Sequence, residues 1–146
     1  PHLQGRFAHL EELPNKMIRN LEKKLMEEIT GAFPNLYLCS SKKEEFGIAI
    51  LEALAERLLV FAPIAGGVKT YLENGKNGFL IDTSSWQTIA KAVKEVIYQS
   101  AMTLEDFRKI QIKGQQTVKN SYSMEEISKK FLAFYLKIKE GKACEG

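Results

Sequence analysis

Residues 36–62 read LYLCSSKKEEFGIAILEALAERLLVFA. Two apolar runs, residues 36–39 and 58–62, lie at its ends, and such a run is typical of a parallel strand that is covered on both faces. Between them, residues 48–56 are good helix formers, and Glu45-Phe46-Gly47 makes the turn that enters this helix. The stretch therefore predicts a strand, a helix and a second parallel strand.

The sequence on both sides continues this alternation. Pro63 ends the second strand, and the turn dipeptides Asn74-Gly75 and Asn77-Gly78 precede a third strand that Asp82 closes. Pro suits the first turn of a helix and Gly suits its end. The further elements expected are a strand at residues 2–9, a helix from Pro14 to Gly31, a short helix at 68–73 opened by Gly66-Gly67, and a strand at 79–81.

Three helices are expected after residue 84. Ser84 or Ser85 caps the first, Thr103 with Asp106 forms a capping box for the second, and Ser123 with Glu126 forms one for the third. The apolar stripe of the first helix consists of Trp86, Ile89, Val93, Val96 and Ile97, and that of the third of Ile127, Phe131, Phe134, Tyr135 and Ile138. We expect Trp86 to be a core residue, because it lies on such a stripe.

The order of these elements predicts an α/β fold with a partial Rossmann-like parallel sheet, helices on both faces and three terminal helices. About four strands are expected, fewer than the ~5–6 of a typical sheet, so half of a doubly wound domain is missing or the fold is unusually small. The expected division is a partial Rossmann-like, ligand-binding domain at residues 1–100 and a helical extension at 101–146 that packs on it.

Composition excludes several classes of function. The 146 residues are 45% hydrophobic and 27% charged with a net charge of +3, which is typical of a globular protein and gives no block of charge for nucleic acid. No apolar run approaches the ~20 residues of a membrane span. Cys39 and Cys144 make neither a metal spacing nor a disulfide framework, which favours a reducing, cytoplasmic setting. The chain begins at Pro1, so a processed or truncated piece is expected.

The turn before the central helix is the candidate site. In doubly wound folds, ligands bind where a strand gives way to a helix N-terminus, and Glu44 and Phe46-Gly47-Ile48 lie at such a point. Backbone N–H groups are free there and favour oxygen-rich ligands. Gly47 lets a ligand approach the backbone, and the Glu52 carboxylate, one turn further on, can accept two hydrogen bonds from a ribose diol.

The wider pattern resembles a known family. Glu44 and Glu52 have seven residues between them, and LEALA at 51–55, an apolar strand, Gly66-Gly67 and NGKNGFLID at 74–82 follow in order. This pattern is similar to the C-terminal, donor-binding domain of retaining GT-B glycosyltransferases of the group 1 type. That group includes sucrose synthase, sucrose-phosphate synthase and glycogen synthase.

The resemblance implies a role for each residue of the turn. Glu44 would be catalytic and contact the transferred sugar, Phe46, Gly47 and Ile48 would offer backbone N–H groups to the sugar and diphosphate, and Glu52 would hold the ribose. The implied reaction is transfer of a sugar from a UDP-, ADP- or GDP-hexose to an acceptor hydroxyl with retention, without a metal or other cofactor. The acceptor would bind an N-terminal domain, against which the last helix packs, and the isolated chain would have no useful turnover.

Four departures from the family pattern stand out. Glu45 replaces a frequent Gly, Glu56-Arg57-Leu58-Leu59 replaces Gly-x-Pro and is expected to alter a turn rather than the site, and Thr70 replaces a frequent acid. Arg6 and Lys16 lack the spacing of the family's diphosphate clamp and are not assigned.

Other interpretations stay open at this point. Exposed carboxylates are the rule, so Glu44 could be a solvated loop acid, and Glu52 could favour the helix N-terminus electrostatically. Gly66-Gly67 fits tight packing first, and His2 and His9 lack partners at ligand spacing. The competing functions are a non-catalytic sugar-nucleotide-binding module or inactive paralogue, an epimerase on a related fold, and a signalling-type α/β domain.

Overall fold

A computed structural model describes residues 11–27 and 34–139 of the chain. The elements in chain order are α1 (Asn15–Glu27), β1 (Leu36–Leu38), α2 (Ile48–Ala55), β2 (Leu59–Pro63), the 3₁₀ turn η1 (Val68–Thr70), β3 (Phe79–Ile81), α3 (Trp86–Lys94), the π-helical turn η2 (Glu95–Gln99), α4 (Leu104–Ser121) and α5 (Met124–Lys139). The predicted strand at 2–9 and the helix end at Gly31 lie outside the described residues.

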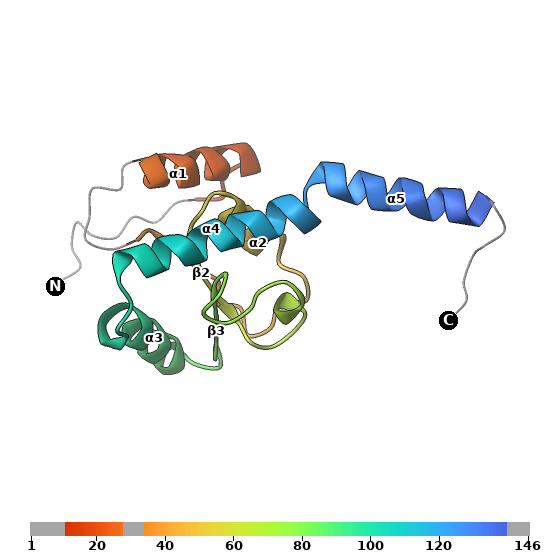
Figure 1. Ribbon diagram of the computed structural model, residues 1–146. Helices are drawn as coiled ribbons and strands as arrows, with labels where there is room; N and C mark the ends of the chain where they lie inside the picture. The colour runs from red at the N-terminus through yellow and green to blue at the C-terminus, as the bar shows by residue number, and fades with distance from the viewer. Residues whose placement is uncertain (1–10, 28–33, 140–146) are drawn as a thin grey trace.

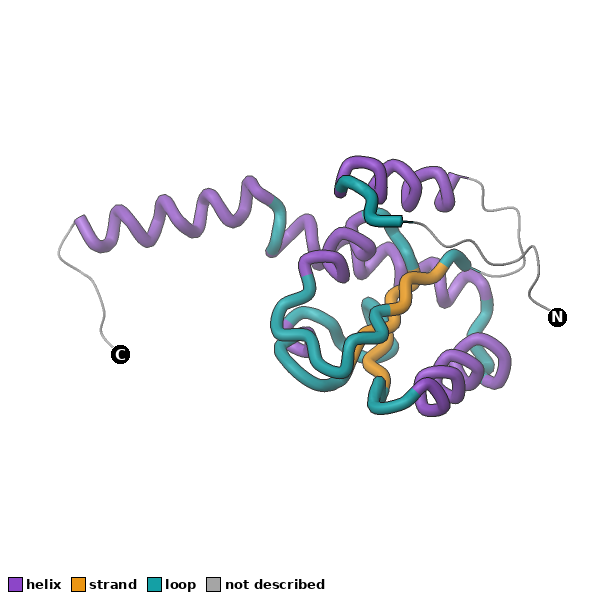
Figure 2. Tube along the Cα trace, turned by 180° about the vertical axis from the view of Figure 1, so that it is seen from behind, coloured by secondary structure: helices purple, strands orange, loops and turns teal. Residues whose placement is uncertain are grey.

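The three strands form one parallel sheet with β2 in the centre (Figure 2). The register pairs Leu36 with Leu59 and Phe61 with Phe79. All five residues of β2 are buried, as expected for a parallel strand covered on both faces. The prediction of a short parallel sheet is therefore confirmed.

The two faces of β2 contribute to two separate cores. Val60 and Ala62 pack with the apolar side of α2, whereas Leu59 and Phe61 pack with β3, α3 and α4. The Phe61 and Phe79 rings stack at a centroid distance of 5.1 Å. The side chains alternate because successive residues of a strand point to opposite faces, and the result is the predicted helix cover on both sides of the sheet.

The last two helices behave differently. The predicted Thr103–Asp106 capping box begins α4, which lies across α2 and buries Phe107 and Ile110 against the sheet. In contrast, α5 projects away from the body of the molecule (Figure 1), and its apolar stripe is exposed at Phe131, Phe134 and Tyr135. No helix among the described residues combines the length and apolar content that a bilayer crossing needs.

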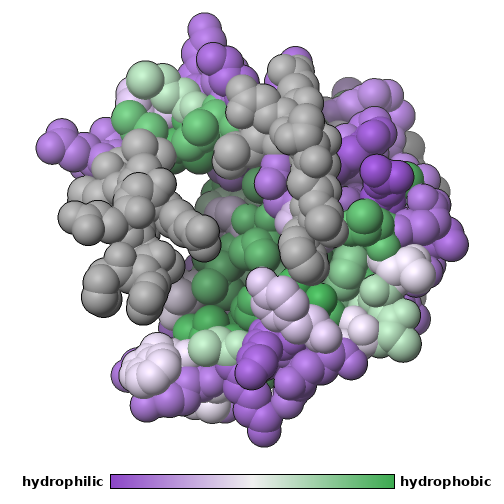
Figure 3. All heavy atoms as spheres, turned by 90° about the vertical axis from the view of Figure 1, so that its left-hand side faces the viewer, coloured by the Kyte–Doolittle hydropathy of each residue, from purple (hydrophilic) through white to green (hydrophobic). Residues whose placement is uncertain are grey.

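The prediction that Trp86 is a core residue is wrong. Its side chain is 74% exposed, because Trp86 is the first residue of α3, directly after the Ser85 cap. The later members of the same stripe, Ile89, Val93, Val96 and Ile97, pack on the core. Trp86 instead lines an apolar groove of about 600 Å³ together with Leu38 of the edge strand and Tyr98. Apolar side chains gather in a hollow on the side of the molecule where α3 lies (Figure 3).

Candidate functional site

The predicted turn lies at the carboxyl edge of the sheet. After β1, Glu44 makes an isolated parallel bridge with Gly66, which follows β2. The Glu44 N–H donates to the Ala65 carbonyl at 3.2 Å, and the Gly67 N–H donates to the Glu44 carbonyl at 3.0 Å. The chain after β1 is thus held to the chain after β2, and the site is built at the position where α/β folds bind ligands.

The glycine pair makes this contact possible. A Cβ atom on Gly66 would lie 2.2 Å from the Glu44 carbonyl oxygen, and one on Gly67 would lie 2.0 Å from that of Glu45. Both distances are far below any normal contact. The glycine pair therefore has the structural role that the sequence favoured. It affects the site by allowing this close backbone contact.

The start of α2 presents free backbone donors. Gly47 is the N-cap with a φ of 74°, and its carbonyl accepts the N–H groups of Ile50 and Leu51. The N–H groups of Phe46, Gly47 and Ile48 have no acceptor among the residues that the structure describes. The side chains of Phe46 and Ile48 are exposed on either side. Unpaired N–H donors at the positive end of a helix dipole favour an anionic group.

Glu44 is half-buried at one end of this turn. It lies near the half-buried Tyr37 and the buried Tyr71. Burial raises the pKa of both phenols, and the charge of Glu44 raises it further. Burial, with smaller contributions from the charges of Cys39, Glu22, Glu44 and Glu52, raises the pKa of Tyr37 to about 12. Both acids of the predicted pair therefore act on one tyrosine of β1.

Glu52 lies on α2, one helical turn after the helix begins, and its side chain is 27% exposed. Its Oε1 is 3.4 Å from Nη1 of Arg19 on α1. Glu22, one turn after Arg19, is only 8% exposed, and its Oε2 has no hydrogen-bond partner within the described ranges. The sequence analysis missed both residues, because their spacing on α1 indicates a helix face and says nothing of what that face contacts.

Glu22 is an unfavourable buried charge. Burial raises the pKa of its carboxyl above the ordinary value of 4.5, and the charges of Glu52 and Glu56 raise it further, against the opposing effect of Arg19. We expect Glu22→Gln to stabilise the fold at pH 7 by about 1 kcal/mol, the scale of an unsatisfied buried group.

The sign follows from proton linkage. Below pH 4.5 the carboxyl of Glu22 is protonated in both the folded and the unfolded chain, so the mutant and the wild type should be equally stable. As pH rises through the raised pKa, folding of the wild type requires an unfavourable charge and its stability falls. Urea unfolding of both proteins between pH 4 and 8 measures this difference, and a gain that does not grow with pH would refute the explanation.

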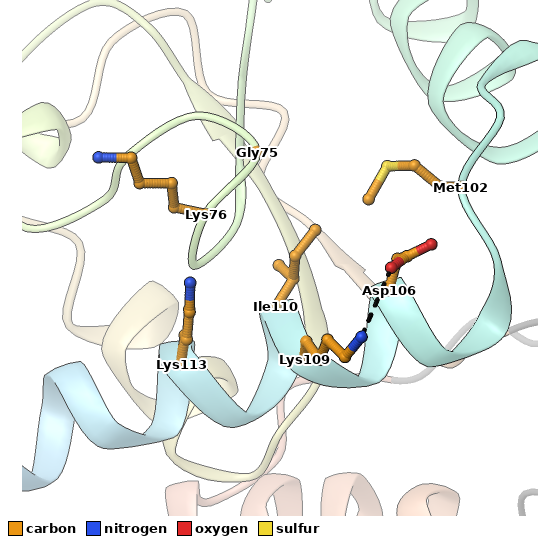
Figure 4. Close-up of a pocket in the computed structure, with 7 residues that line it drawn as sticks. All are labelled: Gly75, Lys76, Met102, Asp106, Lys109, Ile110 and Lys113. Atoms are coloured by element: carbon orange, nitrogen blue, oxygen red, sulfur yellow. Dashed lines mark ion pairs between the residues drawn. The ribbon is translucent and has the colours of Figure 1, made fainter.

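A second hollow, of about 260 Å³, lies between the turn after η1 and α4 (Figure 4). Lys76, Lys109 and Lys113 line it, but Lys76 pairs with Glu73 at 2.5 Å and Lys109 with Asp106 at 3.9 Å. These exposed pairs contribute little, and the hollow is a solvated surface. Among residues 11–27 and 34–139, no group of three His, Cys, Asp or Glu side chains is arranged to hold a metal ion.

Two departures from the family pattern now have structural explanations. Arg57 has a φ of 61°, the left-handed conformation that favours glycine, at the end of α2, and its Nε donates to Gln115 on α4 at 2.9 Å. The change therefore alters a turn, as predicted. Thr70 donates its hydroxyl to the Gly67 carbonyl at 2.7 Å, so this side chain closes its own 3₁₀ turn.

Comparison with solved structures shows that the fold is that of GT-B glycosyltransferases. A glycosyltransferase from Rickettsia africae superposes on it with a TM-score of 0.62 and 27% identity over 71% of this chain and 27% of that one. An Anabaena protein solved in complex with UDP gives a TM-score of 0.57 and 23% identity over 68% of this chain and 26% of that one.

The family follows from the sequence match. Residues 8–117 match the family described as Glycosyl transferases group 1, and the chain belongs to this family. It is 30% identical over 91 residues to a sucrose synthase of Denitrovibrio acetiphilus, which covers 62% of this chain and 12% of that protein. The chain thus spans a small part of the relatives that it matches, and the residue roles given above remain predictions.

Proposed function

We propose that this chain is the donor-binding half of a retaining glycosyltransferase. The observation that carries the proposal is the start of α2, where the N–H groups of Phe46, Gly47 and Ile48 have no acceptor among the described residues. In the sequence these residues stand between Glu44 and Glu52. Membership of the group 1 glycosyl transferases supports transfer of a sugar as the reaction. The Anabaena neighbour bound UDP, which supports a nucleotide diphosphate as the leaving group.

Each residue has a proposed task. The three N–H groups stabilise the diphosphate as negative charge develops on it, because oriented dipoles do so without reorganising. Glu44 contacts the hydroxyls of the transferred sugar and stabilises positive charge near its anomeric carbon. Glu52 accepts hydrogen bonds from the ribose hydroxyls, and its contact with Arg19 orients the carboxylate. The proposal assigns no step to a metal or other cofactor.

The acceptor site is proposed to lie on an N-terminal domain outside this sequence. The chain covers 12% of the sucrose synthase and 27% of the Rickettsia structure that it matches. We therefore propose that residues 1–146 alone bind a donor weakly and turn over no substrate. The exposed stripe of α5, at Phe131, Phe134 and Tyr135, is the proposed contact with the second domain.

The test is binding of a panel of UDP-, ADP- and GDP-sugars to full-length protein by calorimetry. For the sugar nucleotide that binds, Glu52→Ala should weaken affinity about tenfold, the effect of one charge-assisted hydrogen bond. The fold should tolerate the change. Burial raises the pKa of Glu22 and the negative charge of Glu52 raises it further, so the removal of Glu52 relieves a repulsion.

Glu56→Ala is the matched control, since Glu56 lies one turn later and acts on Glu22 in the same way but has no proposed ribose contact. Equal losses of affinity for the two variants would mean that Glu52 does not hold the nucleotide. A panel in which no sugar nucleotide binds would refute the proposed function.

The second candidate is a sugar-nucleotide-binding module without catalysis. It is favoured by Thr70, which occupies a position where the family often carries an acid and is engaged in its own turn. Binding without transfer or donor hydrolysis by the full-length protein would support this alternative.

A further inference from the structure

Three aromatic rings from distant parts of the sequence meet beside the start of α2. Tyr71, after η1, lies 6.1 Å from the ring of Phe46 and 5.6 Å from that of Tyr122, and Phe46 and Tyr122 are 6.2 Å apart. All three pairs are edge-to-face, a favourable arrangement for aromatic rings. Tyr122 ends α4, so the cluster joins the bend at Phe46-Gly47 to the C-terminal helices.

The Tyr71 hydroxyl contacts the backbone that carries the donors. It donates to the Phe46 carbonyl at 2.5 Å and lies 3.4 Å from the Gly47 carbonyl. The same oxygen would be 3.1 Å from a Cβ atom on Gly47. The hydroxyl therefore shares the space that the glycine leaves open with the side chains of Ile50 and Glu44, which would lie 2.7 and 3.0 Å from such a Cβ atom.

This contact determines where the donors point. A carbonyl and the N–H of the next residue share one rigid peptide plane and point in opposite directions. A fixed Phe46 carbonyl fixes the Gly47 N–H, and a fixed Gly47 carbonyl fixes the Ile48 N–H. The Gly47–Ile48 peptide is also held from the helix side, because its carbonyl accepts the Ile50 and Leu51 N–H groups. The Phe46 carbonyl accepts no other hydrogen bond among the described residues, and Gly47 has a φ of 74° and no side chain. The Tyr71 hydroxyl is therefore the contact that fixes the Phe46–Gly47 peptide.

Tyr71 is itself held in place by the buried side chain of Asn77. It is 5% exposed, and the buried Asn77 donates from Nδ2 to the Tyr71 carbonyl at 2.8 Å and to the Thr117 hydroxyl of α4 at 3.0 Å. Asn77 also accepts the Glu73 N–H at 2.7 Å. The hydroxyl therefore projects from a rigid support.

We propose that Tyr71 is a positioning residue for donor binding, whose hydroxyl holds the Phe46–Gly47 peptide with its N–H group toward the diphosphate. This inference rests on the proposed function and names a residue that it does not include. Burial, with the charge of Glu44 as the next contribution, raises the pKa of Tyr71 above its ordinary value. The hydroxyl thus keeps its proton and donates throughout the neutral range.

The test uses Tyr71→Phe in the full-length protein, which keeps the ring and removes the hydroxyl. Tyr122→Phe is the matched control, because Tyr122 lies in the same aromatic cluster and its hydroxyl is not among the groups that hydrogen-bond to the bend at Phe46-Gly47 in the described chain. Affinities for UDP, ADP and GDP and for the matching nucleosides are measured by calorimetry. The diphosphate that binds should lose about three- to tenfold in affinity in Tyr71→Phe, the net effect of one hydrogen bond, and its nucleoside should lose less than about twofold. An equal loss for both ligands would overturn the inference.

Hydrogen exchange without ligand separates this inference from the proposed function. Rotation of the Phe46–Gly47 peptide in Tyr71→Phe changes the φ of Gly47 and loosens the N-cap, whose carbonyl accepts the Ile50 and Leu51 amides. The protection of these two amides should therefore fall about three- to tenfold. Unchanged protection would overturn the role of Tyr71 even if nucleotides bind. If the wild type binds no nucleotide, the proposed function fails, and exchange still decides whether Tyr71 holds the bend.

Discussion

Glu44→Gln in the full-length enzyme is expected to lower turnover about a hundredfold, the scale found when one group that stabilises charge in a transition state is removed. Glutamine keeps the size and the hydrogen-bonding reach of the side chain but not its charge. Glu44 is half-buried and held at the sheet edge by backbone contacts to Ala65 and Gly67, which the mutation does not touch. The melting temperature should therefore change little.

Glu45→Gln is the matched control, because it removes the same charge one residue away. The Glu45 side chain is largely exposed and pairs with Lys43 at 2.5 Å, and an exposed pair contributes little. Its turnover should stay within about twofold of the wild type. Steady-state rates of sugar transfer at a saturating concentration of the sugar nucleotide measure the turnover of both variants. If the two variants lose turnover equally, the charge of Glu44 has no special part in the reaction, and if neither loses it, the reacting sugar lies elsewhere.

The sequence predicted the parts of the fold that depend on local pattern. Residues 36–62 gave both strands and the helix between them, and the Thr103–Asp106 box was found as predicted. These features are encoded within a few residues, since apolar runs indicate buried strands and short polar side chains indicate caps.

The sequence could not show which distant residues meet. Arg19 reaches Glu52, Tyr71 reaches Phe46, and Trp86 is exposed although it lies on an apolar stripe. Each outcome depends on how whole elements pack, and a helical stripe does not fix which of its members contact the core. The candidate site was therefore predicted as a segment of chain, but its supporting contacts required the structure.

The donor site also depends on the glycine pair after β2. Gly66→Ala should destabilise the protein by about 4 kcal/mol, because a clash of its Cβ with a backbone atom costs about 1–3 kcal/mol and a strained φ costs a similar amount. Gly66 has a φ of 105°, and its new Cβ would lie 2.2 Å from the Glu44 carbonyl oxygen. The Glu44 carbonyl oxygen is a backbone atom and cannot move aside by a change of rotamer. The bend at Glu44 must therefore move away from β2, and the N–H groups of Phe46, Gly47 and Ile48 move with it.

Gly75→Ala separates the two contributions. Gly75 has a φ of 73°, but an added Cβ would meet nothing within 4 Å, so this change tests backbone strain without a clash and should cost about 1 kcal/mol. Urea unfolding of both variants gives the free energies of unfolding. Because the clash is with the turn itself, Gly66→Ala should also lose donor binding under conditions where it remains folded, whereas Gly75→Ala should bind as the wild type does. Equal destabilisation by the two changes would mean that the contact between Glu44 and Gly66 does not hold the turn, and the support inferred for the site would be wrong.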